Sequence, residues 1–252
     1  MNTIESIRSR SMYRGRLQER RLADADLLRL IEAAGWAPSG HNSQPWEFLV
    51  VDDSELISRI AGIASANFDA FLENSAELRR FVANFGCWLR WSEQELVDAG
   101  DGIFFERMSR VAWQELDAMT DIEDIRKRLI GILGSHGTPS RLISTAPCLI
   151  ITLVNTLRRI PDDSNDMMAL TSAGAAMQNL RLAATELGIA VHEQSPVYDL
   201  PETRDALRVL LGIPAECRIV GGMRLGYPSD PVRSSRTHVR RPVAAVMHRN
   251  RY

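Results

Sequence analysis

The chain has 252 residues, of which 45% are hydrophobic and 25% charged, and 30 basic residues nearly balance 32 acidic ones. A net charge of −2 argues against binding to nucleic acid through an overall positive charge. No apolar run approaches the roughly 18–20 residues of a membrane span, and the first residues lack the apolar core of a signal peptide. We therefore expect a cytoplasmic globular protein that binds neither membrane nor nucleic acid.

The basic residues are almost entirely arginines, because Lys127 is the only lysine. Codon usage in a GC-rich genome explains most of this bias. Arginine also binds phosphate through two parallel hydrogen bonds, so an anion site in this chain is expected to use arginine. Arg10 and Arg14 are four residues apart and would share one face if this segment were helical.

Hydrophobic spacing predicts the elements of the first 154 residues. A helix is expected over 24–35, capped by Asp24 or Asp26 and closed by Gly35. A polar turn and a buried strand at 48–51 follow. The pattern then indicates mostly helix over 54–130, with a capping box at 92–96, a glycine-containing loop at 131–139 and a second buried strand at 146–154.

The remaining residues are predicted to form two more strands and two more helices. Residues 155–167 are a polar connection, and a helix rich in small residues is expected over 169–187, closed by Gly188. A strand at 189–192, a helix at 201–211 closed by Gly212 and a strand at 217–225 follow. Four strands separated by helices, without strict alternation, favour an α+β fold.

Several common site types have no motif in this sequence. There is no Gly-x-Gly-x-x-Gly after a strand, no phosphate loop and no Gly-x-Ser-x-Gly elbow. The five histidines lack metal-ligand spacing, so we expect no metal site, and three scattered cysteines suggest no disulfide framework. We expect Cys87 and Cys148 to be buried apolar residues.

The turn at 38–46 places two prolines, a glycine and several polar side chains between a helix and a buried strand. Turns held by rigid elements often carry ligand contacts. The amides of Asn42 and Gln44 can each donate and accept hydrogen bonds, which suits the edge of a heterocycle. The same composition is also typical of a structural turn whose side chains cap backbone groups.

Four segments resemble the FMN-dependent nitroreductase family, in the order and spacing of that family. The turn fits its A-P-S-x-x-N-x-Q-P-W-x-F signature through Ala37, Pro38, Ser39, Asn42, Gln44, Pro45, Trp46 and Phe48. Arg10 and Arg14 match the outer arginines of an N-terminal element. The helix SAGAAMQNLRLAATELGI resembles the family's dimer-core helix, and the LGYP and RRP sequences resemble its closing element.

The resemblance implies an α+β fold with a central, mainly antiparallel sheet flanked by helices, in an interlocked homodimer. It implies FMN as cofactor and NADH or NADPH as electron donor. Hydride passes through the flavin N5, so no catalytic side chain is expected, although His41 is a candidate general acid. The cofactor-binding residues that it implies are Arg10, Ser11, Met12, Arg14, Pro38, Ser39, Gly40, Asn42, Gln44, Gln194, Ser195, Pro196 and Arg240.

The chain also departs from the family pattern. Met12 stands where the family has serine, which puts one hydrogen bond to the cofactor in doubt, and Ser11 is a partial substitute. We expect one FMN-binding domain over 1–252 that contains a helical insertion at about 64–140, which covers the flavin and selects the substrate. An arm at about 228–252 would wrap the partner subunit.

The function that follows is an oxidoreductase that passes hydride from NAD(P)H through FMN to an electron-poor small molecule, such as a nitroaromatic or a quinone. One alternative is a reductive dehalogenase, or a dehydrogenase of a specialised metabolite, on the same FMN site. A non-enzymatic alternative is a nucleic-acid-binding module that uses the arginines of residues 8–21.

Overall fold

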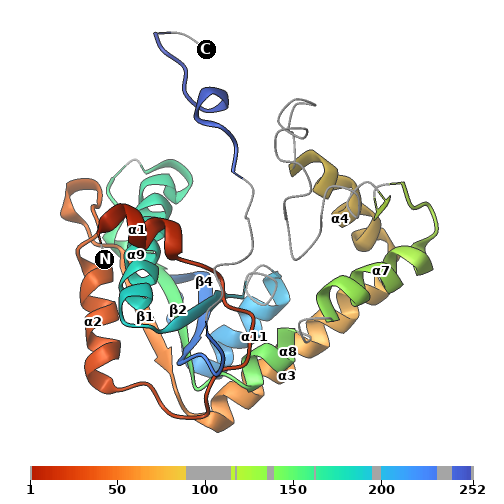
Figure 1. Cartoon of the computed structure of the whole chain (residues 1–252), viewed down its shortest axis with the longest axis horizontal. Helices are drawn as coiled ribbons and strands as arrows, with labels where there is room; N and C mark the ends of the chain where they lie inside the picture. The colour runs from red at the N-terminus through yellow and green to blue at the C-terminus, as the bar shows by residue number, and fades with distance from the viewer. Residues whose placement is uncertain are drawn as a thin grey trace. The chain divides into compact units, whose positions relative to one another are not determined.

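The computed structural model describes residues 2–88, 115–116, 118–134, 139–161, 163–194, 200–231 and 240–250 (Figure 1). The chain divides into two compact units. The first unit comprises Met1–Phe68 and Gly137–Val232, and the second comprises Asp69–His136 and Arg233–Tyr252.

A four-stranded antiparallel sheet forms the centre of the first unit. Its strands are β1 (Trp46–Val51), β2 (Cys148–Asn155), β3 (Ala190–Glu193) and β4 (Cys217–Gly226), in the order β1-β2-β4-β3. The register pairs Phe48 with Thr152 and His192 with Arg224. The predicted α+β fold with an antiparallel sheet is confirmed.

Helices cover both faces of this sheet (Figure 1). The helices of the first unit are α1 (Thr3–Ser9), α2 (Asp24–Gly35), α8 (Pro139–Ser144), α9 (Met167–Glu186), α11 (Pro201–Leu211) and most of α3 (Ser54–Glu73). Short 3-10 turns are η1 (Gly40–Asn42), η2 (Thr156–Arg158) and η3 (Ser164–Asp166).

The sheet separates two apolar cores. On one face, Leu30 of α2 and Leu180 of α9 pack with Ile150 of β2. On the other face, Ile60 of α3 and Leu207 of α11 belong to a second cluster. β2 is buried on both faces, which explains its continuous apolar run.

Cys148 at the start of β2 is fully buried, as expected, and burial raises the pKa of its thiol to about 12. A thiol protonated at neutral pH is a poor nucleophile, so we assign it to packing alone. The side chain of Cys87 lies outside the described residues.

The second unit contains α4 (Ser75–Trp88), α7 (Ile122–Gly134) and η4 (Val243–Ala245). Phe71 and Phe81 meet edge to face with ring centroids 5.5 Å apart. Arg126 donates from Nε to the carbonyl of Leu72 at 2.7 Å, which ties α7 to the end of α3. Among the described residues, no helix has the length and apolar composition needed to cross a membrane.

Three local expectations are wrong. The helix α7 continues through Gly131 to Gly134, where a loop was expected. Ala23 is the N-cap of α2 and has no polar side chain to cap it, because the helix begins at Asp24 and places both Asp24 and Asp26 inside its first turn. Asp26 there accepts a hydrogen bond from the Tyr227 hydroxyl. The helix α1 ends at Ser9, so Arg10 and Arg14 do not share a helical face. The capping box expected at 92–96 lies outside the described residues.

Candidate functional site

The N-terminal arginine segment runs beside β3, an edge strand of the described sheet. Arg10 is the C-cap of α1 and donates its backbone N–H to the carbonyl of Ser6 at 3.0 Å. Beyond it, the N–H of Tyr13 donates to the carbonyl of Val191 in β3 at 2.9 Å. This bond holds the segment extended along the sheet edge, with Arg10, Ser11, Met12 and Arg14 all partly buried.

Gln194 follows β3 in the same part of the fold. Its N–H donates to the carbonyl of Gly222 in β4 at 2.9 Å, so the extended chain continues beyond the strand. Its amide Nε2 lies 2.7 Å from Nδ1 of His192, and both side chains are buried. Ser195 and Pro196, which were grouped with Gln194, lie outside the described residues.

The turn between α2 and β1 has an unusual backbone. His41, Asn42 and Gln44 have φ of 53°, 54° and 43°, in the left-handed region that side chains other than glycine seldom adopt. Each such residue costs on the order of 1–3 kcal/mol, and such strain is concentrated at ligand-binding sites. The side chains of Asn42 and Gln44, like that of His41, are exposed.

Side-chain hydrogen bonds hold the turn in this conformation. Ser39 Oγ accepts from the N–H of Gln44 at 3.0 Å, and Gln44 Nε2 donates to Oδ1 of Asn42 at 3.0 Å. At its end, the carbonyl of Pro45 accepts from the N–H of Asn155 at 2.8 Å. The turn therefore presents a fixed set of amide and hydroxyl groups.

The connection between β2 and α9, together with the start of α9, packs against the turn at Gly40. A Cβ at Gly40 would lie 3.4 Å from Cε of Met168 and 3.6 Å from Cδ1 of Ile160. Asp163 fixes the start of α9, because its carboxylate accepts the N–H groups of Met168 at 2.8 Å and Ala169 at 3.1 Å. These bonds replace the helix cap that Asp166 does not provide.

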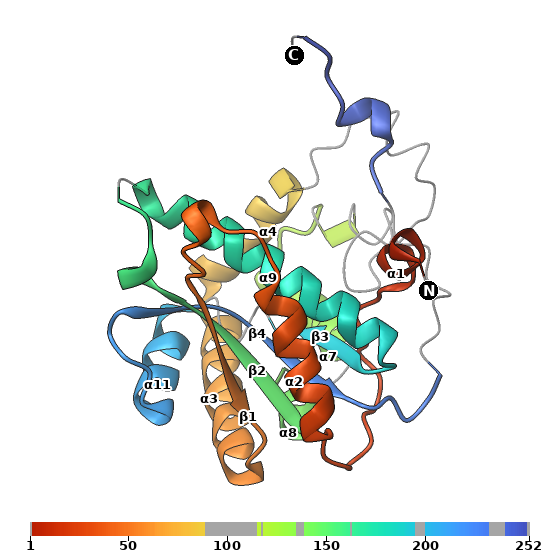
Figure 2. The same ribbon diagram turned by 90° about the vertical axis from the view of Figure 1, so that its left-hand side faces the viewer.

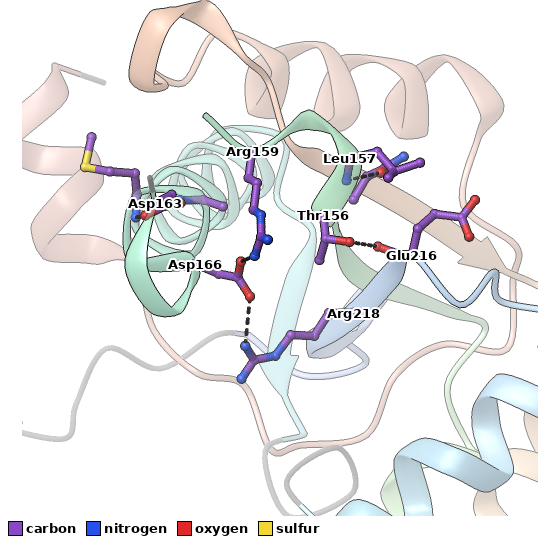
Figure 3. Close-up of polar contacts among 10 residues, drawn as sticks. Thr156, Leu157, Arg159, Asp163, Asp166, Glu216 and Arg218 are labelled. Carbon is purple, nitrogen blue, oxygen red and sulfur yellow. Dashed lines mark hydrogen bonds and ion pairs between the residues drawn. The ribbon is translucent and has the colours of Figure 1, made fainter. Parts of the chain in front are cut away.

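An ion network ties this connection to the sheet (Figure 3). The carboxylate of Asp166 meets the guanidinium of Arg159 at 2.8 Å and that of Arg218 in β4 at 3.4 Å. The hydrogen bond from Arg159 is the largest cause that lowers the pKa of Asp166, and the charges of both arginines act in the same direction. Asp166 is therefore ionised at neutral pH, and its ion pair with Arg218 holds the connection against β4.

Within a single chain, the turn and the arginine segment lie far apart, at opposite ends of α9. The turn contacts Met168 in the first turn of α9, whereas the arginine segment bonds to β3, which follows the last turn of α9. A helix of 20 residues is about 30 Å long. Figure 2 shows α1 near one end of α9 and the segment that precedes β1 near the other.

Arg240 belongs to the second unit and is exposed. Its grouping with Arg10 and Arg14 remains a prediction.

Two residues that support these segments, Asp166 and Arg224, were not predicted from the sequence. Asp166 stands in a polar connection, and acidic residues in such connections are usually exposed to solvent, so nothing in the sequence distinguishes it. Arg224 stands inside a buried strand, and its guanidinium donates to the carbonyls of Tyr13 and Gly15, which are more than 200 residues away in sequence. The only available signal was a charged residue within an apolar run.

Comparison with known proteins identifies the family. The model of the nitroreductase family matches residues 7–227. A 4-nitrobenzoate reductase from Nocardioides sp. (strain LMS-CY) is 26% identical, over 92% of this chain and 86% of that protein.

Two solved structures share the fold. The NADPH:FMN oxidoreductase from Vibrio harveyi, complexed with NAD+, has a TM-score of 0.61 and 17% identity, covering 100% of this chain and 78% of that chain. Oxidized iodotyrosine deiodinase bound to FMN and 3-iodo-L-tyrosine has a TM-score of 0.56 and 22% identity, covering 91% of each chain. The family model spans most of the sequence and the solved folds agree with it, so the chain belongs to the nitroreductase family of flavin-dependent oxidoreductases.

Proposed function

We propose that this protein binds FMN and uses it to pass hydride from NADH or NADPH to an electron-poor small molecule, such as a nitroaromatic or a quinone. The observation that carries the proposal is the strained turn, because it presents Asn42 and Gln44 on the residues that match the family signature. Membership of the nitroreductase family gives the reaction class.

The donor set of the chain suits FMN. Arg10 and Arg14 lie on one extended, partly buried segment, where guanidinium groups can bind a phosphate through charge-assisted hydrogen bonds. Gln194, at the end of β3, offers a buried amide within the same part of the fold. We assign binding of the phosphate and ribityl oxygens to Arg10, Ser11, Met12, Arg14 and Arg240. We assign contacts with the flavin ring to Pro38, Ser39, Gly40, Asn42, Gln44 and the segment 194–196.

FMN, when bound, supplies the ring that accepts and donates hydride, so the protein provides binding, orientation and electrostatics. The arginines hold the anionic end, and the rigid turn fixes the amides of Asn42 and Gln44 at its edge. His41 stands exposed in this turn and is retained as a candidate proton donor to the reduced acceptor.

We infer that a complete site requires two chains. The turn and the arginines lie at opposite ends of α9 in one chain, so an antiparallel, two-fold arrangement of two copies would pair the turn of one with the arginines of the other. This interpretation makes the protein a homodimer with two equivalent sites. The insertion at about 64–140 would then cover the flavin, and the arm at about 228–252 would wrap the partner.

The first test is the colour of the purified protein. A yellow protein that releases FMN on denaturation, and that oxidises NADH or NADPH when a nitroaromatic or quinone is present, would support the proposal. A colourless protein that binds no added FMN and binds nucleic acid with steep salt dependence would overturn it.

The acceptor is tested by comparing nitroaromatics and quinones with halogenated phenols. Similarity of fold to an iodotyrosine deiodinase is the observation that keeps reductive dehalogenation as a second candidate. Release of halide at a rate above that of nitro or quinone reduction would favour that candidate.

A further inference from the structure

Arg224 is a charged side chain in the interior of the first unit. It lies in β4 and is 1% exposed. Its Nη1 donates to the carbonyl of Leu142 in α8 at 3.2 Å, and its Nη2 donates to the carbonyls of Tyr13 at 3.1 Å and Gly15 at 2.8 Å. Tyr13 and Gly15 flank Arg14, so the guanidinium holds the backbone on both sides of that residue.

The charge of Arg224 is not neutralised within the described part of the chain. Its guanidinium meets three carbonyls there and no carboxylate, and its buried Nε has no hydrogen-bond partner. Burial lowers its pKa to about 10; of the neighbouring groups, Tyr13 raises this pKa and the positive charge of Arg14 lowers it. Arg224 therefore stays protonated at neutral pH, close to a second cation.

This arrangement is unfavourable by itself. An ion transferred to a protein interior costs several kcal/mol unless an opposite charge compensates. Two guanidiniums close together add repulsion, which an anion bound between or beside them would relieve. An apolar side chain at position 224 would avoid both costs but would leave these three carbonyls without the donors of Arg224. The carbonyls account for the hydrogen bonds of the guanidinium but carry no negative charge, so the uncompensated charge favours a ligand of opposite sign.

We propose that Arg224 is a positioning residue for phosphate: it fixes the backbone around Arg14 and adds positive charge behind it, so that the segment selects a phosphorylated flavin over an unphosphorylated one. The inference rests on the proposed function, because it deepens the role of the Arg10–Arg14 segment. It concerns a phosphate monoester and not the flavin ring.

Riboflavin separates the two parts of the ligand, because it has the ring and ribityl chain of FMN without the phosphate. Apoprotein would be titrated with FMN and with riboflavin, each followed by flavin fluorescence. We expect the wild type to prefer FMN. Arg224→Met should weaken FMN binding about tenfold, which corresponds to about 1.4 kcal/mol, and should leave riboflavin binding unchanged within about twofold.

Arg208 offers a matched control, because its guanidinium also donates to backbone carbonyls, those of Ile213, Pro214 and Cys217. It lies on α11; Ile213 and Pro214 belong to the segment between α11 and β4, and Cys217 is the first residue of β4. Arg208→Met should lower the melting temperature and keep the ratio of FMN to riboflavin affinity of the wild type. An equal loss for both flavins in Arg224→Met, or no loss, would overturn the proposal.

A double-mutant cycle tests whether Arg224 acts through Arg14, and uses Arg224→Lys in case the methionine variant does not fold. Lysine keeps the charge but lacks the planar fork that reaches three carbonyls. We expect Arg224→Lys to weaken FMN binding when Arg14 is intact, and to cause no further loss of FMN affinity in a chain that already carries Arg14→Ala. Full additivity would contradict the proposal, whereas a wild type that binds neither flavin would instead overturn the proposed function.

Discussion

The backbone N–H of Gln44 donates to Oγ of Ser39 at 3.0 Å, across a turn in which Gln44 has φ of 43°. This bond offsets part of the cost of the left-handed conformation. We expect Ser39→Ala to lower the free energy of unfolding by about 1 kcal/mol and to weaken FMN binding, because the amides of the turn lose their fixed orientation.

Ser43→Ala is the matched control for this prediction. Ser43 lies in the same turn, and its hydroxyl makes no hydrogen bond within the described residues. Chemical denaturation of the apoprotein and titration with FMN measure both quantities. Equal behaviour of the two variants would show that the Ser39 hydroxyl does not hold the turn.

The second prediction concerns the phosphate arginines. Arg10→Ala and Arg240→Ala should each reduce FMN affinity roughly ten- to hundredfold, because a hydrogen bond to a charged group contributes about 1.5–3 kcal/mol. Arg29→Ala on α2 serves as control, since its side chain is 66% exposed and pairs with Asp26 at 3.8 Å. Full flavin content in both variants would refute this assignment of the phosphate site.

The third prediction concerns acid stability. The pKa of Asp166 lies below its ordinary 3.8, mainly because Arg159 donates a hydrogen bond to the ionised carboxylate. A lowered native pKa stabilises the fold above the unfolded pKa, and this contribution disappears as pH falls through the native pKa. Asp166→Asn should therefore lower the melting temperature at neutral pH, and the difference from wild type should shrink below about pH 4.

Asp205→Asn on the exposed side of α11 is the control for Asp166→Asn. Its melting temperature should follow that of the wild type across the whole pH range. A difference for Asp166→Asn that persists unchanged into acid would mean that the network in Figure 3 does not depend on the ionised carboxylate.

The fourth prediction compares two glycines. Gly212 closes α11 with φ of 62°, a conformation that costs roughly 1–2 kcal/mol for a residue with a Cβ. Gly62 lies inside α3, and a Cβ there would meet nothing within 4 Å. Gly212→Ala should destabilise the protein by that amount, whereas Gly62→Ala should stabilise it by roughly 0.5–1 kcal/mol. Thermal unfolding of both variants decides the sign of each effect.

Local chemistry was sufficient to predict most of the elements. Both bounds of α2 were predicted, and Gly212 ends α11 in the left-handed conformation that only glycine adopts at low cost. The buried strand β2 was visible as an apolar run, although its first residue was placed two positions early. These features depend on residues adjacent in sequence.

Features that depend on distant partners could not be predicted. The arginine segment is extended, not helical, because the carbonyl of Val191 accepts the N–H of Tyr13 across the sheet edge. Asp26 is not a cap because α2 already begins at Asp24, and its carboxylate instead accepts from Tyr227, which is 201 residues away in sequence. The turn was recognised as a candidate site from its motif, but its strain and its support by Ile160 and Met168 required the fold.

The length of α9 has a genetic consequence. If the two ends of α9 contribute to two different sites, a substitution in the turn and a substitution in the arginine segment of the same chain affect different sites of the dimer. Co-expression of an Asn42→Ala chain with an Arg14→Ala chain would then produce hybrid dimers in which one site carries both lesions and the other carries none. Such hybrids, purified with two different affinity tags, should bind one FMN per dimer at a concentration where neither parent binds any.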